Sequence, residues 1–192
     1  MAVVVVGGQA RKVGKTSVVC GLIAALPERQ WTAVKITDHA HGLASGQEFA
    51  ITEERDPSGA TDTARFLQAG APRALLVSSP GGHLADAMPE LRRALQGAEN
   101  VILESNSVMR FLRPDVYLAV LDSATADFKD SAREFLAMAS ALVVCGEPAG
   151  PPALEGIAGK PVFTVRPPQY VTRELLEFVR GALGCSADSH RF

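Results

Sequence analysis

The sequence predicts an α/β fold in which a mainly parallel sheet of roughly seven strands is covered by helices on both faces. Two observations support this prediction. The candidate strands, such as Val101–Glu104 and Val116–Leu121, are short and nearly continuous apolar runs, and strands of that kind are buried on both faces. Segments with helical periodicity separate most of these runs, which is the order expected of strand–helix–strand units.

The whole chain, residues 1–192, is expected to form one domain. It has 192 residues and a hydrophobic content of 47%, which suffices for one substantial core. It shows neither an internal repeat nor a linker, and residues 184–192 are expected to be a frayed tail.

The individual elements follow from local patterns along the chain. A valine run that begins at Ala2 is the first strand, Pro27 stops the first helix, and Gly70 marks the end of the second. The other expected strands are 31–37, 74–78, 101–104, 116–121, 141–145 and 161–165; the expected helices are 16–26, 62–69, 84–95, 131–139 and 172–183.

Two segments are expected to lack regular structure. Residues 146–152 are interpreted as a surface loop. Residues 43–60 are rich in Gly, Ser, Glu and Asp and are interpreted as a long loop, which is either a static surface loop or a mobile flap that becomes ordered over the site with ligand.

A phosphate-binding motif directly follows the first strand. The valine run breaks into a glycine-containing loop that ends in Gly14-Lys15-Thr16, and an apolar helical segment follows. Backbone N–H groups of such a loop and the positive end of the helix converge on an anion. The usual spacing would place a glycine at Gln9, so the loop that starts at Gly8 is one residue longer than the common form. The expected nucleotide-binding residues are Gly8, Gln9, Ala10, Arg11, Lys12, Val13, Gly14, Lys15, Thr16 and Ser17, and the predicted fold class is the three-layer P-loop NTPase fold.

Chemical roles follow from the residue types in this loop. Lys15 would reach the β- and γ-phosphates, and the Thr16 hydroxyl would ligate Mg²⁺. Arg11 and Lys12 lie where charge develops during phosphoryl transfer, so either one could stabilise that charge; Lys12 is counted among the catalytic candidates. The alternative for both residues is ordinary surface charge.

Three acidic residues and one lysine are expected at the carboxyl edge of the sheet, where open α/β sheets bind ligands. Glu104 closes a buried strand, as a Walker-B acid does, and is the first candidate to hold Mg²⁺. Asp38 is a second metal candidate and Asp122 is held in reserve. Lys35 is a candidate for a catalytic phosphate- or substrate-binding role, with a solvated lysine at a strand end as the alternative.

The pair His39 and His41 could be imagined as metal ligands or as a base, but an ordinary polar turn is favoured because no further ligand has suitable spacing. The segments that start at Cys145 and Arg166 follow the last two strands, where related folds recognise the base. Neither segment matches the Asn-Lys-x-Asp guanine signature, so the choice between ATP and GTP stays open.

Composition argues against several other classes of function. A formal charge of -2 gives no electrostatic reason to expect nucleic acid or an acidic membrane surface as partner. The three cysteines are widely spaced, which predicts free thiols and a cytoplasmic protein. Neither a signal peptide nor a membrane-spanning segment is expected.

Four segments together resemble the molybdopterin-guanine dinucleotide biosynthesis protein B (MobB-like) family. They are the Gly14-Lys15-Thr16 loop, Val34-Lys-Ile-Thr-Asp-His-Ala-His41, the segment from Asp56 through the 62–69 helix to Ala71, and Val101-Ile-Leu-Glu104. The loop spacing itself resembles that of dethiobiotin synthetase, whose corresponding second strand also carries a lysine near the active site. The chain departs from the MobB-like pattern in its longer loop and in Ser105, which stands where the family has glycine.

The resemblance implies an Mg²⁺-dependent protein that binds a nucleoside triphosphate, hydrolyses it slowly and acts as an adaptor in molybdenum-cofactor or related cofactor biosynthesis. One alternative is a dethiobiotin-synthetase-like kinase or ligase that acts on a small acid. The other is a nucleotide-controlled switch, and a protein partner or a homodimer would suit the adaptor and the switch alike.

Overall fold

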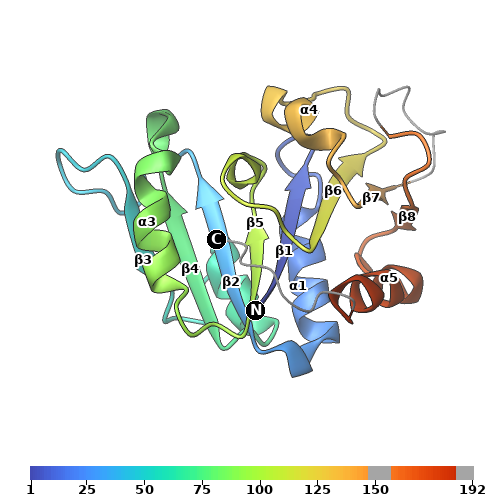
Figure 1. The fold of residues 1–192 in the computed structure, drawn as a ribbon, viewed down its shortest axis with the longest axis horizontal. Helices are drawn as coiled ribbons and strands as arrows, with labels where there is room; N and C mark the ends of the chain where they lie inside the picture. Colours follow the sequence, from blue (N-terminus) through green and yellow to red (C-terminus); the bar gives the residue numbers. More distant parts are fainter. Residues whose placement is uncertain (147–156, 185–192) are drawn as a thin grey trace.

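A computed structural model describes residues 1–146 and 157–184 and shows one sheet flanked by helices (Figure 1). The described residues contribute eight strands in the order β3-β4-β2-β5-β1-β6-β7-β8. The strands are β1 (Ala2–Gly8), β2 (Trp31–Thr37), β3 (Ala50–Glu53), β4 (Arg73–Ser78), β5 (Asn100–Glu104), β6 (Val116–Asp122), β7 (Ala141–Cys145) and β8 (Val162–Val165).

All neighbouring strands are parallel except β3, which pairs antiparallel with β4. The valine strand β1 lies at the centre of the sheet between β5 and β6. Its side chains from Val3 to Val6 are fully buried, as expected for a strand that is covered on both faces. The predicted α/β class with a mainly parallel sheet is therefore confirmed.

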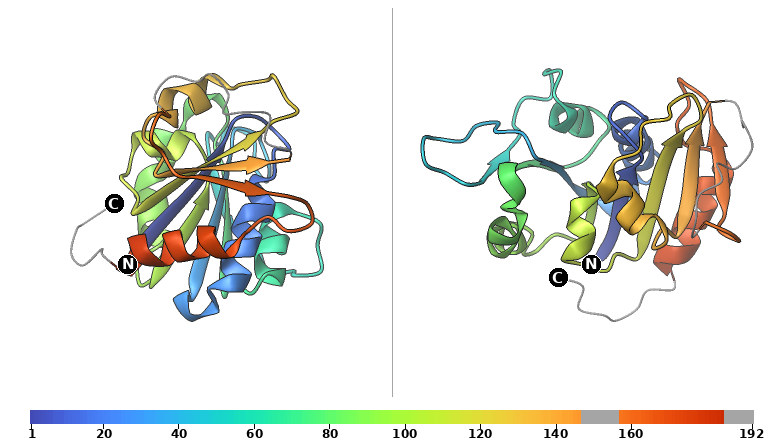
Figure 2. Two further views of the ribbon diagram at one scale, coloured as in Figure 1. Left: turned by 90° about the vertical axis from the view of Figure 1, so that its right-hand side faces the viewer. Right: turned by 90° about the horizontal axis from the view of Figure 1, so that it is seen from above.

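Helices cover both faces of this sheet (Figure 2). One apolar layer joins the sheet to α1, α2 and α5, and the other joins it to α3 and α4. The helices are α1 (Lys15–Ala25), α2 (Asp62–Gln68), α3 (Leu84–Ala94), α4 (Asp130–Leu136) and α5 (Arg173–Gly184), with short 3-10 turns η1 (Pro27–Arg29), η2 (Pro80–Gly82) and η3 (Ser107–Arg110). Every predicted helix is present, with its ends within a few residues of the predicted ones.

The prediction of one long loop over residues 43–60 is wrong at β3. Ala50 to Glu53 form an edge strand that brings the sheet to eight strands rather than roughly seven. The strand is only four residues long, and its register places Ile51 opposite the buried Val77 of β4. A salt bridge of 2.8 Å between Glu53 and Arg73 adds a contact at the same edge. Such a short strand is difficult to distinguish from a loop by pattern.

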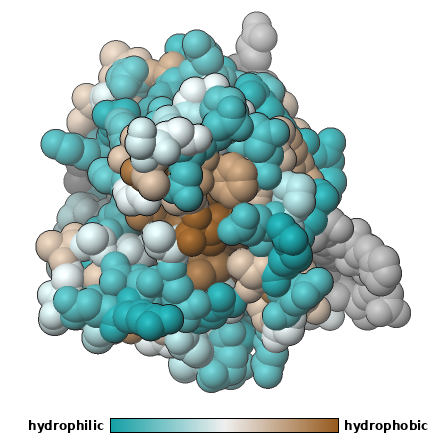
Figure 3. All heavy atoms as spheres, turned by 90° about the vertical axis from the view of Figure 1, so that its left-hand side faces the viewer, coloured by the Kyte–Doolittle hydropathy of each residue, from teal (hydrophilic) through white to brown (hydrophobic). Residues whose placement is uncertain are grey.

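The surface beside this edge strand is mainly hydrophilic, with a small group of apolar residues in a hollow (Figure 3). Within the described ranges, no helix is both long enough and apolar enough to span a membrane. The expected loop at 146–152 and the expected tail at 184–192 lie, apart from Gly146 and Gly184, outside the described residues.

Candidate functional site

The predicted phosphate loop connects β1 to α1 at the carboxyl edge of the sheet. Gly14 precedes the helix with a left-handed φ of 98°, and α1 begins without a side-chain cap. A Cβ atom at Gly14 would also lie 2.9 Å from Tyr170 and 3.1 Å from the Cys145 sulfur. Glycine is therefore required here on conformational and steric grounds. The uncapped first turn leaves its N–H groups available to an anion.

Hydrogen bonds to residues at the ends of β5 and β6 fix the start of the loop. The Asn106 carboxamide accepts a hydrogen bond from the Gly8 N–H at 2.8 Å and donates one to the Gly8 carbonyl at 3.0 Å. Gln9 donates through its side chain to the Thr125 carbonyl at 2.8 Å and accepts from the Asp122 N–H at 3.0 Å. Gln9 is buried, so the residue that departs from the usual glycine spacing ties the loop to the end of β6.

Lys15 folds back over this loop. Its ammonium donates to the Ala10 carbonyl at 2.5 Å. Its aliphatic carbons pass so close to Gly8 that a Cβ atom at that residue would lie only 2.7–2.8 Å from them. Burial lowers the pKa of Lys15 to about 8; the negative charge of Glu104 opposes this shift, while Lys35 and Lys129 add to it. A bound phosphate would supply the anion that this group of lysines faces.

Glu104 is the centre of a buried polar network. Its side chain is only 2% exposed; the Thr16 hydroxyl donates to its Oε2 at 2.7 Å, and the Lys35 ammonium donates to its Oε1 at 2.5 Å. Lys35 and Glu104 are directly opposite each other in the parallel register of β2 and β5. The structure thus brings together three of the residues predicted for the site.

Asp62, which the sequence analysis noted only as the start of a helix, also belongs to this network. Its Oδ2 lies 2.8 Å from the Lys35 ammonium. Burial opposes ionisation of Asp62, but the hydrogen bond and charge of Lys35 outweigh it and hold the pKa of Asp62 below its usual value. Burial would likewise lower the pKa of Lys35, but Glu104 and Asp62 raise it above the ordinary value.

Arg65 connects the same helix, α2, to α1. Its guanidinium donates to the Ser17 hydroxyl at 3.1 Å and lies 3.7 Å from Asp62. The Asp-x-x-Arg spacing on one helix face was the available sequence signal for this pair. Its importance depends on the packing of α2 against α1, which a local pattern does not give.

The remaining predicted residues lie at the edge of the site. Arg11 and Lys12 are exposed at the tip of the loop, and Lys12 has a left-handed φ of 61°. The Asp38 side chain is 73% exposed and lies 3.7 Å from His39. The ring of His39 meets that of His41 edge to face, with 5.9 Å between centroids. The catalytic role predicted for Lys12 or Arg11 and the metal-binding role predicted for Asp38 stay predictions.

Asp122, the reserve metal candidate, accepts a hydrogen bond from the Ala124 N–H at 2.9 Å through its own side chain. This contact shapes the turn after β6, in the manner of an Asx turn. The structure therefore gives Asp122 a local partner, whereas the Thr16 hydroxyl bonds Glu104.

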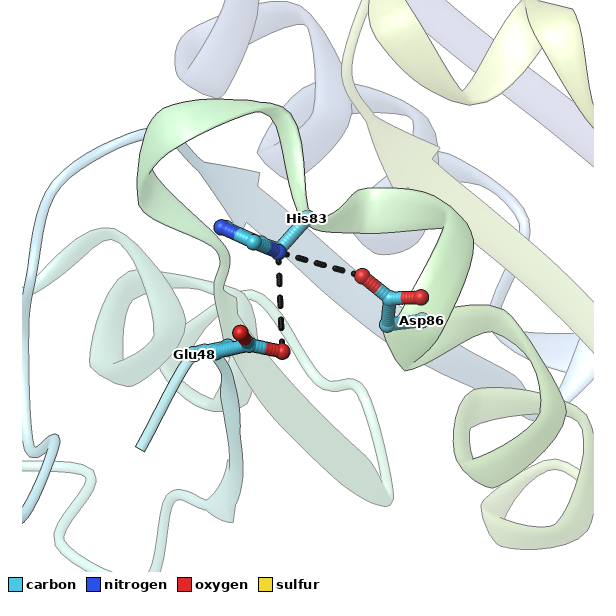
Figure 4. A group of neighbouring side chains, drawn as sticks. All are labelled: Glu48, His83 and Asp86. Carbon is cyan, nitrogen blue, oxygen red and sulfur yellow. Dashed lines mark hydrogen bonds and ion pairs between the residues drawn. The ribbon is translucent and has the colours of Figure 1, made fainter. Parts of the chain in front are cut away.

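A second group of possible metal ligands lies beside the start of α3 (Figure 4). The Nδ1 atom of His83 is 3.1 Å from an Asp86 carboxylate oxygen and 3.6 Å from one of Glu48, and the candidate ligand atoms lie within 4.8 Å of one another. All three side chains are substantially exposed, at 39–64%. Surface ion pairs account for this cluster without a metal, and we assign it none.

The donor set around Thr16 suits magnesium better. Mg²⁺ prefers oxygen ligands and is usually held by one or two carboxylates together with waters and substrate phosphates. The Thr16 hydroxyl and the Glu104 carboxylate are already in contact at the start of α1, and Asp62 is joined to Glu104 through Lys35. The residues present therefore fit this ion.

Comparisons with known proteins agree with this geometry at the level of the fold. No protein-family model matches the chain, and neither does any curated protein sequence. The structure of LpxK from Aquifex aeolicus in complex with ATP matches with a TM-score of 0.54 and 22% identity, over 85% of this chain and 53% of that one. HypB from Helicobacter pylori in complex with nickel matches with a TM-score of 0.54 and 14% identity, over 98% and 91%.

Bacillus subtilis MobB also matches, with a TM-score of 0.47 and 15% identity, over 97% of this chain and 100% of that one. The fold assignment rests on the two higher-scoring matches, and this chain spans about half of the length of the LpxK structure. The chain has the fold of the P-loop NTPases, as its loop motif predicts.

Proposed function

We propose that this protein binds a nucleoside triphosphate, ATP or GTP, together with Mg²⁺ at the loop Gly8–Ser17 and hydrolyses it slowly. The observation that carries the proposal is the direct contact of the Thr16 hydroxyl with Glu104 at the start of α1. That start is also the positive end of a helix dipole, which favours phosphate.

Different residues of the chain bind the phosphates and the metal. The backbone of the loop and Lys15 bind and orient the phosphates, while Thr16 and Glu104 hold Mg²⁺, directly or through water. When bound, Mg²⁺ would neutralise the charge that develops on the transferred phosphoryl group. Slow turnover is expected because Glu104, which already bonds the Thr16 hydroxyl, is assigned to the metal, so its carboxylate is poorly available to activate water.

The proposed role in cofactor biosynthesis rests on the motif resemblance to the MobB-like family. In that role the chain is an adaptor with a protein partner or a second copy of itself, and its turnover does not depend on a small substrate. The kinase or ligase alternative instead requires the Lys35 ammonium to leave two carboxylates in order to hold a small acid. A small acid that accelerates turnover by orders of magnitude would favour this alternative.

Calorimetric titration with non-hydrolysable ATP and GTP analogues tests the central proposal. In the presence of Mg²⁺, Lys15→Ala should weaken binding at least about 100-fold while the fold is retained, because the ammonium contacts phosphate rather than the core. Chelation of Mg²⁺ should also weaken binding by the parent protein.

Lys160 provides a matched control for that substitution. Like Lys15, it is half-buried and donates to backbone carbonyls, in this case those of Ala137 and Ala139. It precedes β8 and so lies at the amino ends of the parallel strands, whereas the site lies at their carboxyl ends. Lys160→Ala should leave nucleotide affinity unchanged. Equal affinity of Lys15→Ala and the parent would refute the proposed function.

A further inference from the structure

The Lys35 ammonium lies between two carboxylates that come from different elements. Its Nζ atom is 2.5 Å from Glu104 at the end of β5 and 2.8 Å from Asp62 at the start of α2. The Lys35 side chain is 18% exposed, and that of Glu104 only 2%. A carboxylate so deeply buried needs a cation nearby, because desolvation strongly penalises an isolated charge.

Glu104 is also the residue that would hold magnesium. One of its oxygens accepts from the Thr16 hydroxyl and the other from Lys35, so the ammonium and the metal would share one carboxylate. Lys15 adds a further positive charge close by, since Glu104 and Lys35 both act on its ionisation. A divalent cation that entered this site alone would meet two lysine ammonium groups and the Arg65 guanidinium beside Asp62, with only two carboxylates to balance them.

We propose that Lys35 is an internal counter-ion that occupies the magnesium-binding carboxylate of Glu104 in the nucleotide-free protein and excludes free Mg²⁺ from it. The proposal rests on the proposed function, because it assigns the order in which the same site is loaded. The triphosphate brings the negative charge that the site lacks, so the metal enters with the nucleotide. Lys35 then moves from Glu104 toward Asp62 or the phosphates, and Asp62 is the positioning residue that retains it.

Thermal unfolding with MgCl₂ and without nucleotide tests this inference. The parent should show no change in Tm at millimolar Mg²⁺. Lys35→Met removes the charge and keeps an apolar stem of similar length, so Mg²⁺ alone should raise its Tm by about 3 °C or more once its concentration is well above Kd. Lys35→Arg retains the charge and should behave like the parent.

The double variant Lys35→Met with Glu104→Gln is the second control. It lacks both members of the buried pair, so it should fold without metal and show no response to Mg²⁺. A second readout is the binding of Mn²⁺ to the nucleotide-free parent, measured by water proton relaxation, which should show no binding at this site. This measurement keeps the inference testable even where Lys35→Met alone does not fold.

Several results would overturn the inference. They are a parent that responds to Mg²⁺ alone as strongly as Lys35→Met does, a folded Lys35→Met that does not respond, or Mn²⁺ binding to the free parent that Glu104→Gln abolishes. Failure of the proposed function gives a different result, namely a parent that binds no nucleotide even with Mg²⁺. The two failures are distinguishable because the metal titrations contain no nucleotide.

Discussion

The two ends of the central strand β1 are held by the same kind of contact but differ in chemistry. At the amino end, Asn100 accepts from the Ala2 N–H at 3.1 Å and donates to the Arg29 carbonyl at 2.6 Å, and Asp115 accepts from the Val3 N–H at 2.8 Å. At the carboxyl end, Asn106 binds both backbone groups of Gly8. In both places an asparagine at an end of β5 satisfies backbone groups of β1, and at the amino end Asp115, which precedes β6, adds a further contact.

The carboxyl end of β1 differs in the phosphate loop that follows Gly8. There the chain adopts left-handed backbone at Lys12 and Gly14, and Lys15 and Lys35 gather around one buried carboxylate. At either end of β1, these hydrogen bonds from side chains to the backbone fix the position of the strand. The proposed chemistry comes from charges whose compensation is incomplete until phosphate binds.

The largest expected change in stability comes from a steric clash at Gly7, which precedes Gly8 at the carboxyl end of β1. A Cβ atom there would lie 2.2 Å from the Asn106 Oδ1 atom and 2.6 Å from the Tyr117 hydroxyl. Gly7→Ala should therefore lower the free energy of unfolding by about 3 kcal/mol, as expected when a packed site is overfilled. Urea denaturation measures this change.

Gly181 of α5 is the matched control for Gly7, because a Cβ atom at Gly181 would have no neighbour within 4 Å. Gly181→Ala should leave stability unchanged or raise it by roughly 0.5–1 kcal/mol, since alanine is the better helix former. A Gly7→Ala variant as stable as the parent would contradict the close packing between β1 and Asn106.

Substitution of Asn100 and Asn106 separates the effect of anchoring β1 on stability from its effect on nucleotide binding. Asn106→Ala and Asn100→Ala should each lower the free energy of unfolding by about 1–3 kcal/mol, because each leaves backbone groups without a partner. Only Asn106→Ala should weaken nucleotide binding, by about tenfold or more, since it releases the start of the phosphate loop. Equal nucleotide affinities in calorimetric titrations of the two variants would show that the hydrogen bonds between Asn106 and Gly8 do not position the loop.

The sequence was sufficient to predict the elements that depend on local patterns. The valine run, the glycine before the helix and the acid that closes an apolar strand each give a local signal, so β1, Gly14 and Glu104 were predicted. The edge strand β3 was missed because four residues that are half-buried or exposed give too short a pattern to distinguish from a loop.

The pairing of charges depends on strand order, which no local pattern contains. Lys35 and Glu104 are 69 residues apart in the chain, and they meet because β2 lies next to β5. Asp62 joins them only because α2 packs against α1 on that face of the sheet. The residues at the carboxyl edge could thus be listed from the sequence, whereas their partners could not.

The segment between β2 and β3 differs from the buried site, because its charged Glu48 side chain is exposed. The expected flap over residues 43–60 is narrowed to the part before β3, since Ala50–Glu53 are paired with β4. Glu48 connects this part to α3 through His83, at 3.6 Å. The contact is an exposed one, in contrast to the buried pair of Lys35 and Glu104.

The smallest expected effect follows from this exposure. His83→Ala should change the free energy of unfolding by less than about 0.5 kcal/mol, because exposed ion pairs contribute little. Hydrogen exchange should show fast amides over residues 43–49 in parent and variant alike, slow amides in β3, and protection of 43–49 when Mg²⁺ and a non-hydrolysable nucleotide are added. If His83→Ala instead lowers the free energy of unfolding by more than about 1.5 kcal/mol, and a chelator lowers that of the parent by a similar amount, then Glu48, His83 and Asp86 hold a metal.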